Sequence, residues 1–181
     1  MKVTKTFIEG LLLIEPDVHG DSRGYFMESF NARTFREATG IDADFVQDNE
    51  SKSSYGVVRG LHFQRPPHAQ AKLVRVVEGR VLDVAVDLRE GSETYGKHFA
   101  VELSEENHFQ MYIPKGFAHG FSVLSEKVVF QYKCDDYYAP ETEGALAWDD
   151  PELAIDWRIP HESVRLSEKD KNHPRLKDLN V

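Results

Sequence analysis

The sequence predicts a mainly β protein, a β-sandwich or β-barrel with a few short helices. The first observation is that apolar and polar residues alternate in many short segments, such as 73–77, 81–88 and 127–133. The second is that glycine or proline separates neighbouring segments, as at Gly79 and Pro114. This spacing favours a sandwich or barrel over alternating βαβ units.

The expected strands follow one another along the chain with turn residues between them. Each is short, and its apolar residues recur at every second position. They cover residues 7–14, 25–30, 45–49, 73–77, 81–88, 99–103, 110–113, 121–124, 127–133 and 144–148. One short helix is expected at 32–38, where Thr39 and Gly40 stop it. Another is expected to begin at Ser167, with acidic residues in its first turn.

Length and composition favour one domain over residues 1–181. A chain of 181 residues can bury most of its apolar surface in a single core. The longest N-terminal apolar run, 11–14, is too short to span a bilayer and lacks a signal-peptide layout. Cys134 is the only cysteine, which excludes an internal disulfide and a multi-cysteine zinc site. We therefore expect a cytoplasmic protein without a membrane segment.

The acidic balance of the chain limits its partners. The formal net charge is −9, so broad attraction to nucleic acid or to an anionic membrane surface is not expected. Arg23, Arg59 and Lys72 nevertheless lie in apolar or glycine-containing surroundings. A few local cations of this kind can hold the pyrophosphate of a small ligand.

A turn and short strand at 56–64 carry the first candidate for chemistry. Alternation places Leu61 and Phe63 on one face, while His62 and Gln64 occupy the other. In isolation such a strand is better explained as half-buried with its polar face in water. A second segment, 113–121, has the same blend of glycine, aromatic residues and one histidine. The pair of segments favours a lined cavity.

These two segments resemble the two cupin motifs. His62 stands six positions after Gly56, as in the first motif, and 114–119 has the Pro-x-Gly-x-x-His core of the second. The metal-binding form of the motif needs a second histidine where Gln64 stands, and a glutamate near 70–72, where Lys72 stands. His68 is a possible substitute ligand, but its neighbouring prolines indicate an exposed loop. The resemblance therefore implies a cupin-type jelly roll with no metal.

Four kinds of side chain are candidates for proton transfer, and each has an alternative structural explanation. His62 suits a general base near neutral pH, although a lone histidine is more often a hydrogen-bonded wall residue. Lys72 lies at a strand end, where a lysine can equally extend to solvent. Tyr132 is either a core aromatic or a proton donor facing the cavity. Asp83 and Asp87 interrupt an apolar strand, so each must meet water or orient a partner such as a histidine.

The ordered motifs of the chain resemble the dTDP-4-dehydrorhamnose 3,5-epimerase family. Each motif alone is weak evidence, but the ordered set is specific and extends roughly over residues 8–170. The motifs are 20–24, 45–49, 59–64, 72–75, 83–87, 113–121, Tyr132, 137–138 and 166–170.

This resemblance implies an enzyme that inverts two carbons of a dTDP-linked 4-keto-6-deoxyhexose without a metal or redox cofactor, and it implies a homodimer. The family's base matches His62, oriented by Asp170, and its proton donor matches Tyr132. Lys72 and His119 match the residues that hold the keto oxygen and the sugar. Nucleotide and phosphate contacts match Arg23, Glu28, Gln47, Asn49, Arg59, Glu143 and Lys169, with Tyr138 stacking on thymine.

The implied substrate is dTDP-4-dehydro-6-deoxy-D-glucose and the product dTDP-4-dehydro-L-rhamnose. C3 and C5 flank the C4 ketone, so both hydrogens become acidic once the enolate is stabilised. The sequence has no glycine-rich dinucleotide motif, and a substrate that already carries the ketone needs none. Three alternatives remain open: a C3-only or C5-only epimerase, a metal-dependent cupin enzyme, and a non-enzymatic sugar-nucleotide binding module.

Overall fold

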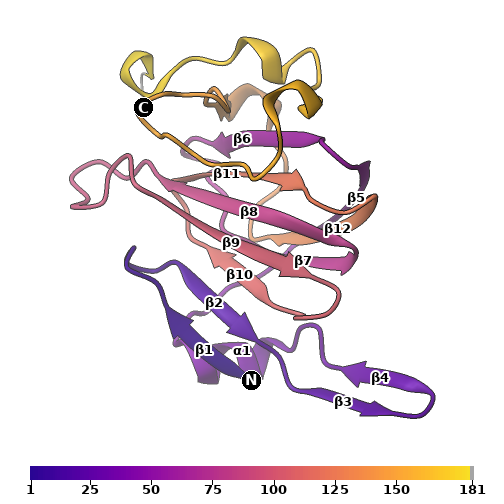
Figure 1. The fold of residues 1–181 in the computed structure, drawn as a ribbon. Helices are drawn as coiled ribbons and strands as arrows, with labels where there is room; N and C mark the ends of the chain where they lie inside the picture. Colours follow the sequence, from indigo (N-terminus) through magenta and orange to yellow (C-terminus); the bar gives the residue numbers. More distant parts are fainter. Residues whose placement is uncertain (180–181) are drawn as a thin grey trace.

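Two facing antiparallel sheets form the body of the computed structural model, which describes residues 1–179 (Figure 1). The first sheet has the order β1 (Lys2–Lys5), β2 (Leu12–Glu15), β10 (Gln110–Ile113), β7 (Lys72–Glu78), β12 (Lys127–Cys134) and β5 (Gln47–Ser54). The second has the order β13 (Glu143–Ala145), β6 (Val58–Gln64), β11 (Phe117–Val123), β8 (Arg80–Asp87) and β9 (His98–Ser104). The mainly β fold is confirmed, and because the two sheets remain separate, it is the sandwich and not the closed barrel of the two predicted forms.

The principal core lies between the two sheets. Its buried members include Val74 and Phe130 from the first sheet and Val81 and Phe121 from the second. A second cluster covers the outer face of the second sheet. It joins apolar residues of β6 and β8 to the C-terminal part of the chain, including Trp157.

Strand β8 is apolar on both faces because both faces are covered. Val81 belongs to the core between the sheets, whereas Leu82 belongs to the outer cluster. The two acids in this strand are fully buried and each has a partner: Asp83 contacts a histidine and Asp87 contacts Arg89. The sequence left open whether these carboxylates meet water or orient a partner, and in the structure each orients a partner.

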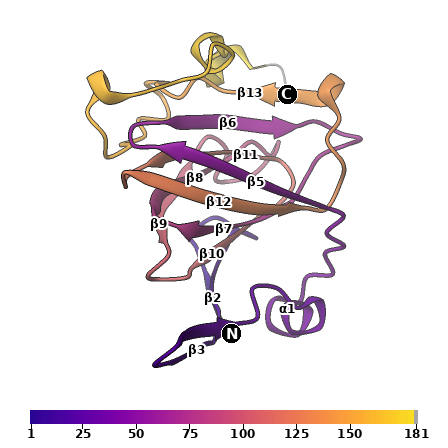
Figure 2. The ribbon, with the colours of Figure 1, turned by 90° about the vertical axis from the view of Figure 1, so that its right-hand side faces the viewer.

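Helix α1 (Ala32–Thr39) confirms the first predicted helix. The Asn31 side chain caps its first turn, and Gly40 ends it with a left-handed backbone, φ 73°. Phe35 is buried against Phe30, Phe45 and Tyr112. Figure 2 shows α1 at the bottom of the molecule, below β7, β10 and β12. Nowhere in residues 1–179 does a helix have the length and apolarity needed to cross a bilayer.

The second predicted helix is not formed. Ser167 does accept a hydrogen bond from the Asp170 backbone at 3.1 Å, as a cap would, but only a single 3₁₀ turn follows, η3 (Asp170–Asn172). Pro174 lies just beyond this turn and has no N–H to extend it. The other 3₁₀ turns are η1 (Pro140–Thr142), η2 (His161–Ser163) and η4 (Leu176–Asp178).

Several strand boundaries differ from the prediction, and two differences are large. The segment 7–14 is not one strand, because a turn at 6–10 separates β1 from β2 and leaves Phe7 exposed. Strand β5 extends to Ser54 through a polar stretch that has no apolar alternation, because β12 pairs with its whole length.

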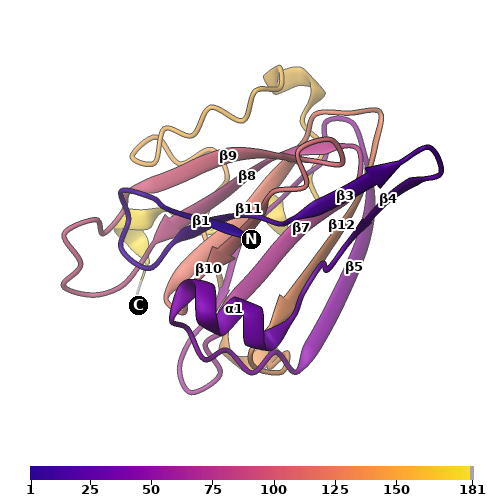
Figure 3. The same ribbon diagram turned by 90° about the horizontal axis from the view of Figure 1, so that it is seen from below.

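A separate hairpin, β3 (Val18–Asp21) with β4 (Gly24–Met27), projects from the body of the molecule (Figures 1 and 3). Its aromatic side chains Tyr25 and Phe26 are exposed. The C-terminal segment lies at the opposite end, over β6 and β13 (Figure 2).

Candidate active site

One cavity of about 650 Å³ opens between the sheets and is bounded at its mouth by the C-terminal segment. It brings together every predicted site residue except Arg23 and Glu28. The predicted residues that line it are Gln47, Asn49, Arg59, His62, Lys72, His119, Tyr132, Tyr138, Glu143, Lys169 and Asp170.

Strand alternation explains how His62 enters the cavity. Its neighbour Leu61 is buried in the outer cluster, so His62 points to the inner face, where its side chain is 32% exposed. His62 is opposite His119 in the pairing of β6 with β11. The two strands approach closely at Gly60, where a Cβ would lie 2.6 Å from the Cα of Gly120.

Asp170 holds the His62 ring. His62 Nε2 lies 2.6 Å from Oδ1 of this carboxylate, and the Ser167 hydroxyl donates to Oδ2 at 2.9 Å. Burial disfavours the charged carboxylate, but hydrogen bonds from His62, His173 and Ser167 outweigh burial and lower the pKa of Asp170 to about 2. An ionised carboxylate only accepts, so Nε2 of His62 carries the proton and Nδ1 keeps the lone pair.

The facing sheet contributes Lys72 and Tyr132. The ammonium of Lys72 lies 5.9 Å from the centre of the Tyr132 ring, and burial lowers the pKa of this lysine. Burial also raises the pKa of the Tyr132 phenol, which therefore stays protonated at neutral pH. Cys134 lies opposite Lys72 on β12, and burial raises the pKa of its thiol to about 11.

His119 forms a second imidazole–carboxylate pair on the cavity wall. Its Nε2 lies 3.0 and 3.1 Å from the two carboxylate oxygens of Asp83, and its ring stacks beside Phe130. Both partners are buried, so the imidazole is fixed in orientation. The expected contact between Asp83 and a histidine is present.

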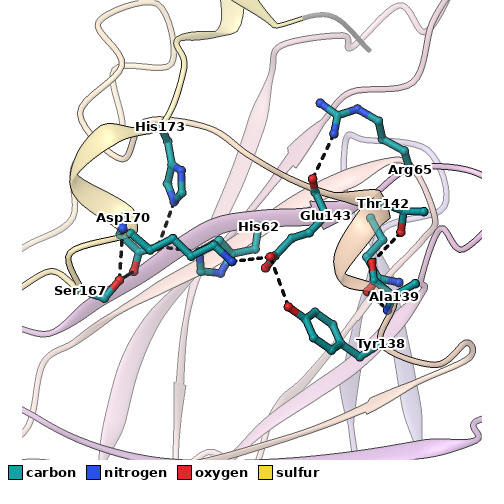
Figure 4. Close-up of polar contacts among 11 residues, drawn as sticks. His62, Arg65, Tyr138, Ala139, Thr142, Glu143, Ser167, Asp170 and His173 are labelled. Carbon is teal, nitrogen blue, oxygen red and sulfur yellow. Dashed lines mark hydrogen bonds and ion pairs between the residues drawn. The ribbon is translucent and has the colours of Figure 1, made fainter.

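Polar side chains at the cavity mouth are joined to one another (Figure 4). Glu143 accepts from the Tyr138 hydroxyl at 3.3 Å and pairs with the Lys169 ammonium. Gln47 donates to Asn49 at 3.1 Å and accepts from the Tyr138 backbone at 3.0 Å. These contacts place amide, carboxylate, ammonium and aromatic groups within reach of one ligand.

Arg23 and Glu28 lie outside the cavity of their own chain. Arg23 is on the projecting hairpin, where its side chain is 88% exposed and pairs with Asp21 at 2.6 Å. Glu28 accepts from Asn31 at 3.0 Å, next to α1.

Gln64 occupies the position where a metal-binding cupin motif has its second histidine. Its side-chain amide donates to the carbonyls of His68 and Tyr137 and accepts from the Ala139 backbone. Gln64 therefore ties two loops at the cavity mouth.

Within residues 1–179, one cluster has side chains that a divalent cation can use, and it includes His173, which no sequence motif indicated. Ligand atoms of His62, Asp170 and His173 lie within 4.8 Å of one another. Their separations, 2.6 and 3.0 Å to the same carboxylate oxygen, are those of hydrogen bonds. The only feature of the sequence that points to His173 is its position three residues after Asp170. The cavity lining also includes Arg165, which lies in an irregular segment without periodicity.

Comparison with known proteins identifies the family. The model of the dTDP-4-dehydrorhamnose 3,5-epimerase family matches residues 5–178. An enzyme of that name from Pseudomonas aeruginosa is 53% identical over 178 residues, which are 98% of this chain and 97% of the relative. The crystal structure of another, from Elizabethkingia anophelis, has a TM-score of 0.95 and 58% identity over 100% of this chain and 99% of that chain.

A second similar structure contains a bound nucleotide sugar. It is dTDP-6-deoxy-D-glucose-3,5-epimerase from Legionella pneumophila in complex with dTDP-4-keto-L-rhamnose, with a TM-score of 0.95 and 50% identity, covering 99% of this chain and 94% of that chain. The sequence resemblance, the cavity and these comparisons agree, and the chain belongs to the dTDP-4-dehydrorhamnose 3,5-epimerase family.

Proposed function

We propose that the protein converts dTDP-4-dehydro-6-deoxy-D-glucose into dTDP-4-dehydro-L-rhamnose by inverting C3 and C5 through enolate intermediates. One observation carries the proposal: the His62–Asp170 pair lies on one wall of the cavity, and Tyr132 with Lys72 lies on the facing wall. Inversion needs a proton removed from one face of the sugar and another delivered to the opposite face. Two walls that each carry a proton-transfer group meet this need.

In this mechanism His62 is the base. Nε2–H is held by Asp170, so Nδ1 takes the proton from the carbon next to the ketone. The carboxylate of Asp170 then stabilises the imidazolium that forms. Tyr132 delivers its phenolic proton from the opposite wall and is reloaded from solvent.

Lys72 stabilises the oxygen at C4, and His119, whose Nε2 is held by Asp83, holds the sugar through its remaining ring nitrogen. Negative charge develops on this oxygen as the proton leaves, and a preorganised donor there is worth about 3 kcal/mol of barrier. The reaction removes one proton and returns one at each carbon, so it needs no oxidant or reductant. The ketone already present in the substrate supplies the acidity.

The mouth of the cavity binds the nucleotide. Arg59 and Lys169 offer positive charge to the diphosphate, and Tyr138 offers a half-exposed ring on which thymine can stack. Gln47 and Asn49 supply amide groups for the base or sugar.

We further infer a cytoplasmic homodimer in which residues 1–181 form one domain. Arg23 and Glu28 match nucleotide-binding positions of the family but lie outside their own cavity. The hairpin that carries Arg23 projects with Tyr25 and Phe26 exposed, as it would if it extended to the cavity of a second copy. The single unpaired thiol, Cys134, suits a reducing compartment.

The direct test follows deuterium from D₂O into positions 3 and 5 of dTDP-4-dehydro-6-deoxy-D-glucose by NMR. We expect incorporation at both carbons with the wild-type protein. His62→Ala should lower exchange at both carbons by at least ~10²-fold, because the base is removed. Tyr132→Phe should retain exchange but lose inversion, because only the donor is removed.

His68→Ala is the matched control, since His68 lies outside the cavity lining and should exchange at the wild-type rate. Wild-type exchange by His62→Ala would refute the assignment of the base. Incorporation at a single carbon would indicate a C3-only or C5-only epimerase. Saturable binding without incorporation would indicate a binding module. Exchange that is lost on chelation and restored by a divalent cation would indicate a metal enzyme.

A further inference from the structure

Two imidazoles contact the same oxygen of Asp170. His62 Nε2 lies 2.6 Å from Oδ1, and His173 Nε2 lies 3.0 Å from the same atom. The Ser167 hydroxyl occupies the other oxygen, Oδ2, at 2.9 Å. Figure 4 shows the His173, Ser167 and His62 side chains around this carboxylate. The proposed mechanism uses His62 and Asp170 but gives no role to His173.

His173 belongs to the support of the site and not to its surface. Its side chain is 9% exposed, and it does not line the cavity. The chain that follows is anchored to the body of the protein: the Pro174 carbonyl accepts from the Ala147 backbone at 2.8 Å, and the Leu176 backbone donates to buried Asp150 at 2.6 Å. The imidazole is therefore presented to Asp170 from a fixed backbone.

The direction of both hydrogen bonds follows from the charge of the acceptor. An ionised carboxylate has no proton to donate, so both imidazoles must present Nε2–H to it. The two rings are 5.7 Å apart and nearly perpendicular, at 88°, so their N–H groups reach Oδ1 from different directions. With Ser167 on the other oxygen, donors from three side chains oppose rotation of the carboxyl group about its Cβ–Cγ bond.

We propose that His173 is a positioning residue that acts through Asp170. Its Nε2–H keeps Oδ1 directed at His62, so that His62 stays in the tautomer with its Nδ1 lone pair free and its ring aligned with the sugar. The inference rests on the proposed function, since it assigns a task within that reaction. His173 makes no contact with substrate in this role.

A pair of variants separates hydrogen-bond donation from packing. His173→Leu fills similar space but cannot donate, and we expect kcat to fall roughly 10-fold, as is common when the outer partner of a functional histidine is lost. His173→Gln places an amide N–H where Nε2 was, so it should recover most of this loss. In both variants KM and the affinity for dTDP should stay at the wild-type level, because the cavity lining is unchanged.

Leu176→Ala is the control for general loosening of the C-terminal segment. Leu176 packs against the outer apolar cluster and does not touch Asp170, so its truncation should leave kcat at the wild-type level. The proposal is overturned if His173→Leu retains the wild-type kcat, if the Leu and Gln variants lose activity equally, or if Leu176→Ala loses as much as His173→Leu.

A second measurement needs no variant and therefore does not depend on the folding of one. Nitrogen-15 NMR of the imidazole rings in the wild-type protein at neutral pH should report a proton on Nε2 of both His62 and His173. A proton only on Nδ1 of His173 would overturn the proposal. This result is independent of turnover: a wild-type protein that exchanges no sugar hydrogen refutes the proposed function, whereas normal exchange with the wrong tautomer refutes only the role of His173.

Discussion

Asp170 is both buried and ionised, so its carboxyl group makes the free energy of unfolding depend on pH. Its pKa in the folded protein, about 2, lies below its ordinary value of 3.8. The stabilisation from its hydrogen-bonded charge is fully present above the ordinary value and is lost as pH falls through the folded value. The free energy of unfolding contributed by this carboxylate therefore decreases between these two pH values.

We expect Asp170→Asn to cost more stability at about pH 5 than at about pH 3, because the wild type loses part of the contribution of this charge at the lower pH. Urea unfolding of both proteins at each pH measures the difference. Asp149→Asn removes an exposed carboxyl and controls for the loss of one negative charge. A gap between wild type and Asp170→Asn that stays constant with pH would contradict the assigned ionisation.

At this scale, sequence reasoning found residues but not their contacts. His62 was indicated by strand alternation and glycine spacing, but its partner lies 108 positions away. No periodicity connects residues so far apart, and only the ordered family motifs indicated Asp170. His173 was missed because an isolated histidine in an irregular segment carries no pattern, and its contact with Asp170 forms only once the segment is folded over β6.

Strands β6 and β11 approach each other closely, and this approach sets the spacing of His62 and His119. Gly60 has φ 127°, and a Cβ there would lie 2.6 Å from Gly120 Cα and 2.9 Å from the His119 carbonyl oxygen. Any side chain would force these strands apart and move His62 relative to His119.

Gly60→Ala should therefore lower the free energy of unfolding by more than about 2 kcal/mol, from backbone strain and overlap together, and should reduce kcat. Gly91→Ala is the comparison, because Gly91 also has a positive φ, 74°, but has open space around it. Its cost should be only about 1 kcal/mol, with activity unchanged. Equal denaturation midpoints for the two variants would show that the strand approach is not the constraint.

Elements were predictable where one local rule dominated. The apolar alternation of β8 and the cap residues of α1 are such cases, and both elements formed. The polar strand β5 and the single turn η3 were not predictable, because each depends on a partner: β12 for the strand, and the contacts of Asp170 for the turn. Propensity describes a segment alone, whereas these two are determined by tertiary pairing.

For the whole molecule, the alternating short segments of the sequence predicted a sandwich. They did not predict that the C-terminal segment covers the outer face of the second sheet. The sequence from Asn172 onward is mostly polar, yet Leu176 and Leu179 pack on the outer apolar cluster. This segment carries His173, which contacts Asp170 from outside the cavity lining. No sequence pattern indicates this packing, because the few leucines of the segment are buried against residues distant in sequence.

The proposed homodimer makes a prediction that only the complete assembly can satisfy. If the hairpin of each copy serves the cavity of the other, a site combines His62 of one chain with Arg23 of its partner. A heterodimer of an Arg23→Ala chain and a His62→Ala chain then has one intact site and one doubly defective site. Random pairing of equal amounts of the two chains should restore about a quarter of the wild-type activity.

Co-expression of the two inactive variants, followed by the deuterium exchange assay, measures this restoration, and each variant expressed alone is the control. If Arg23 acted within its own chain, each site of the heterodimer would lack one group and no activity would return. Sedimentation at micromolar concentration tests separately whether the protein is a dimer. A monomeric wild-type protein would refute the proposed homodimer. Phe26→Asp should produce such monomers, because it places a charge on the exposed aromatic surface of the hairpin. Tyr95→Asp is the control, because it places the same charge on an exposed aromatic residue away from the hairpin and should leave the dimer intact.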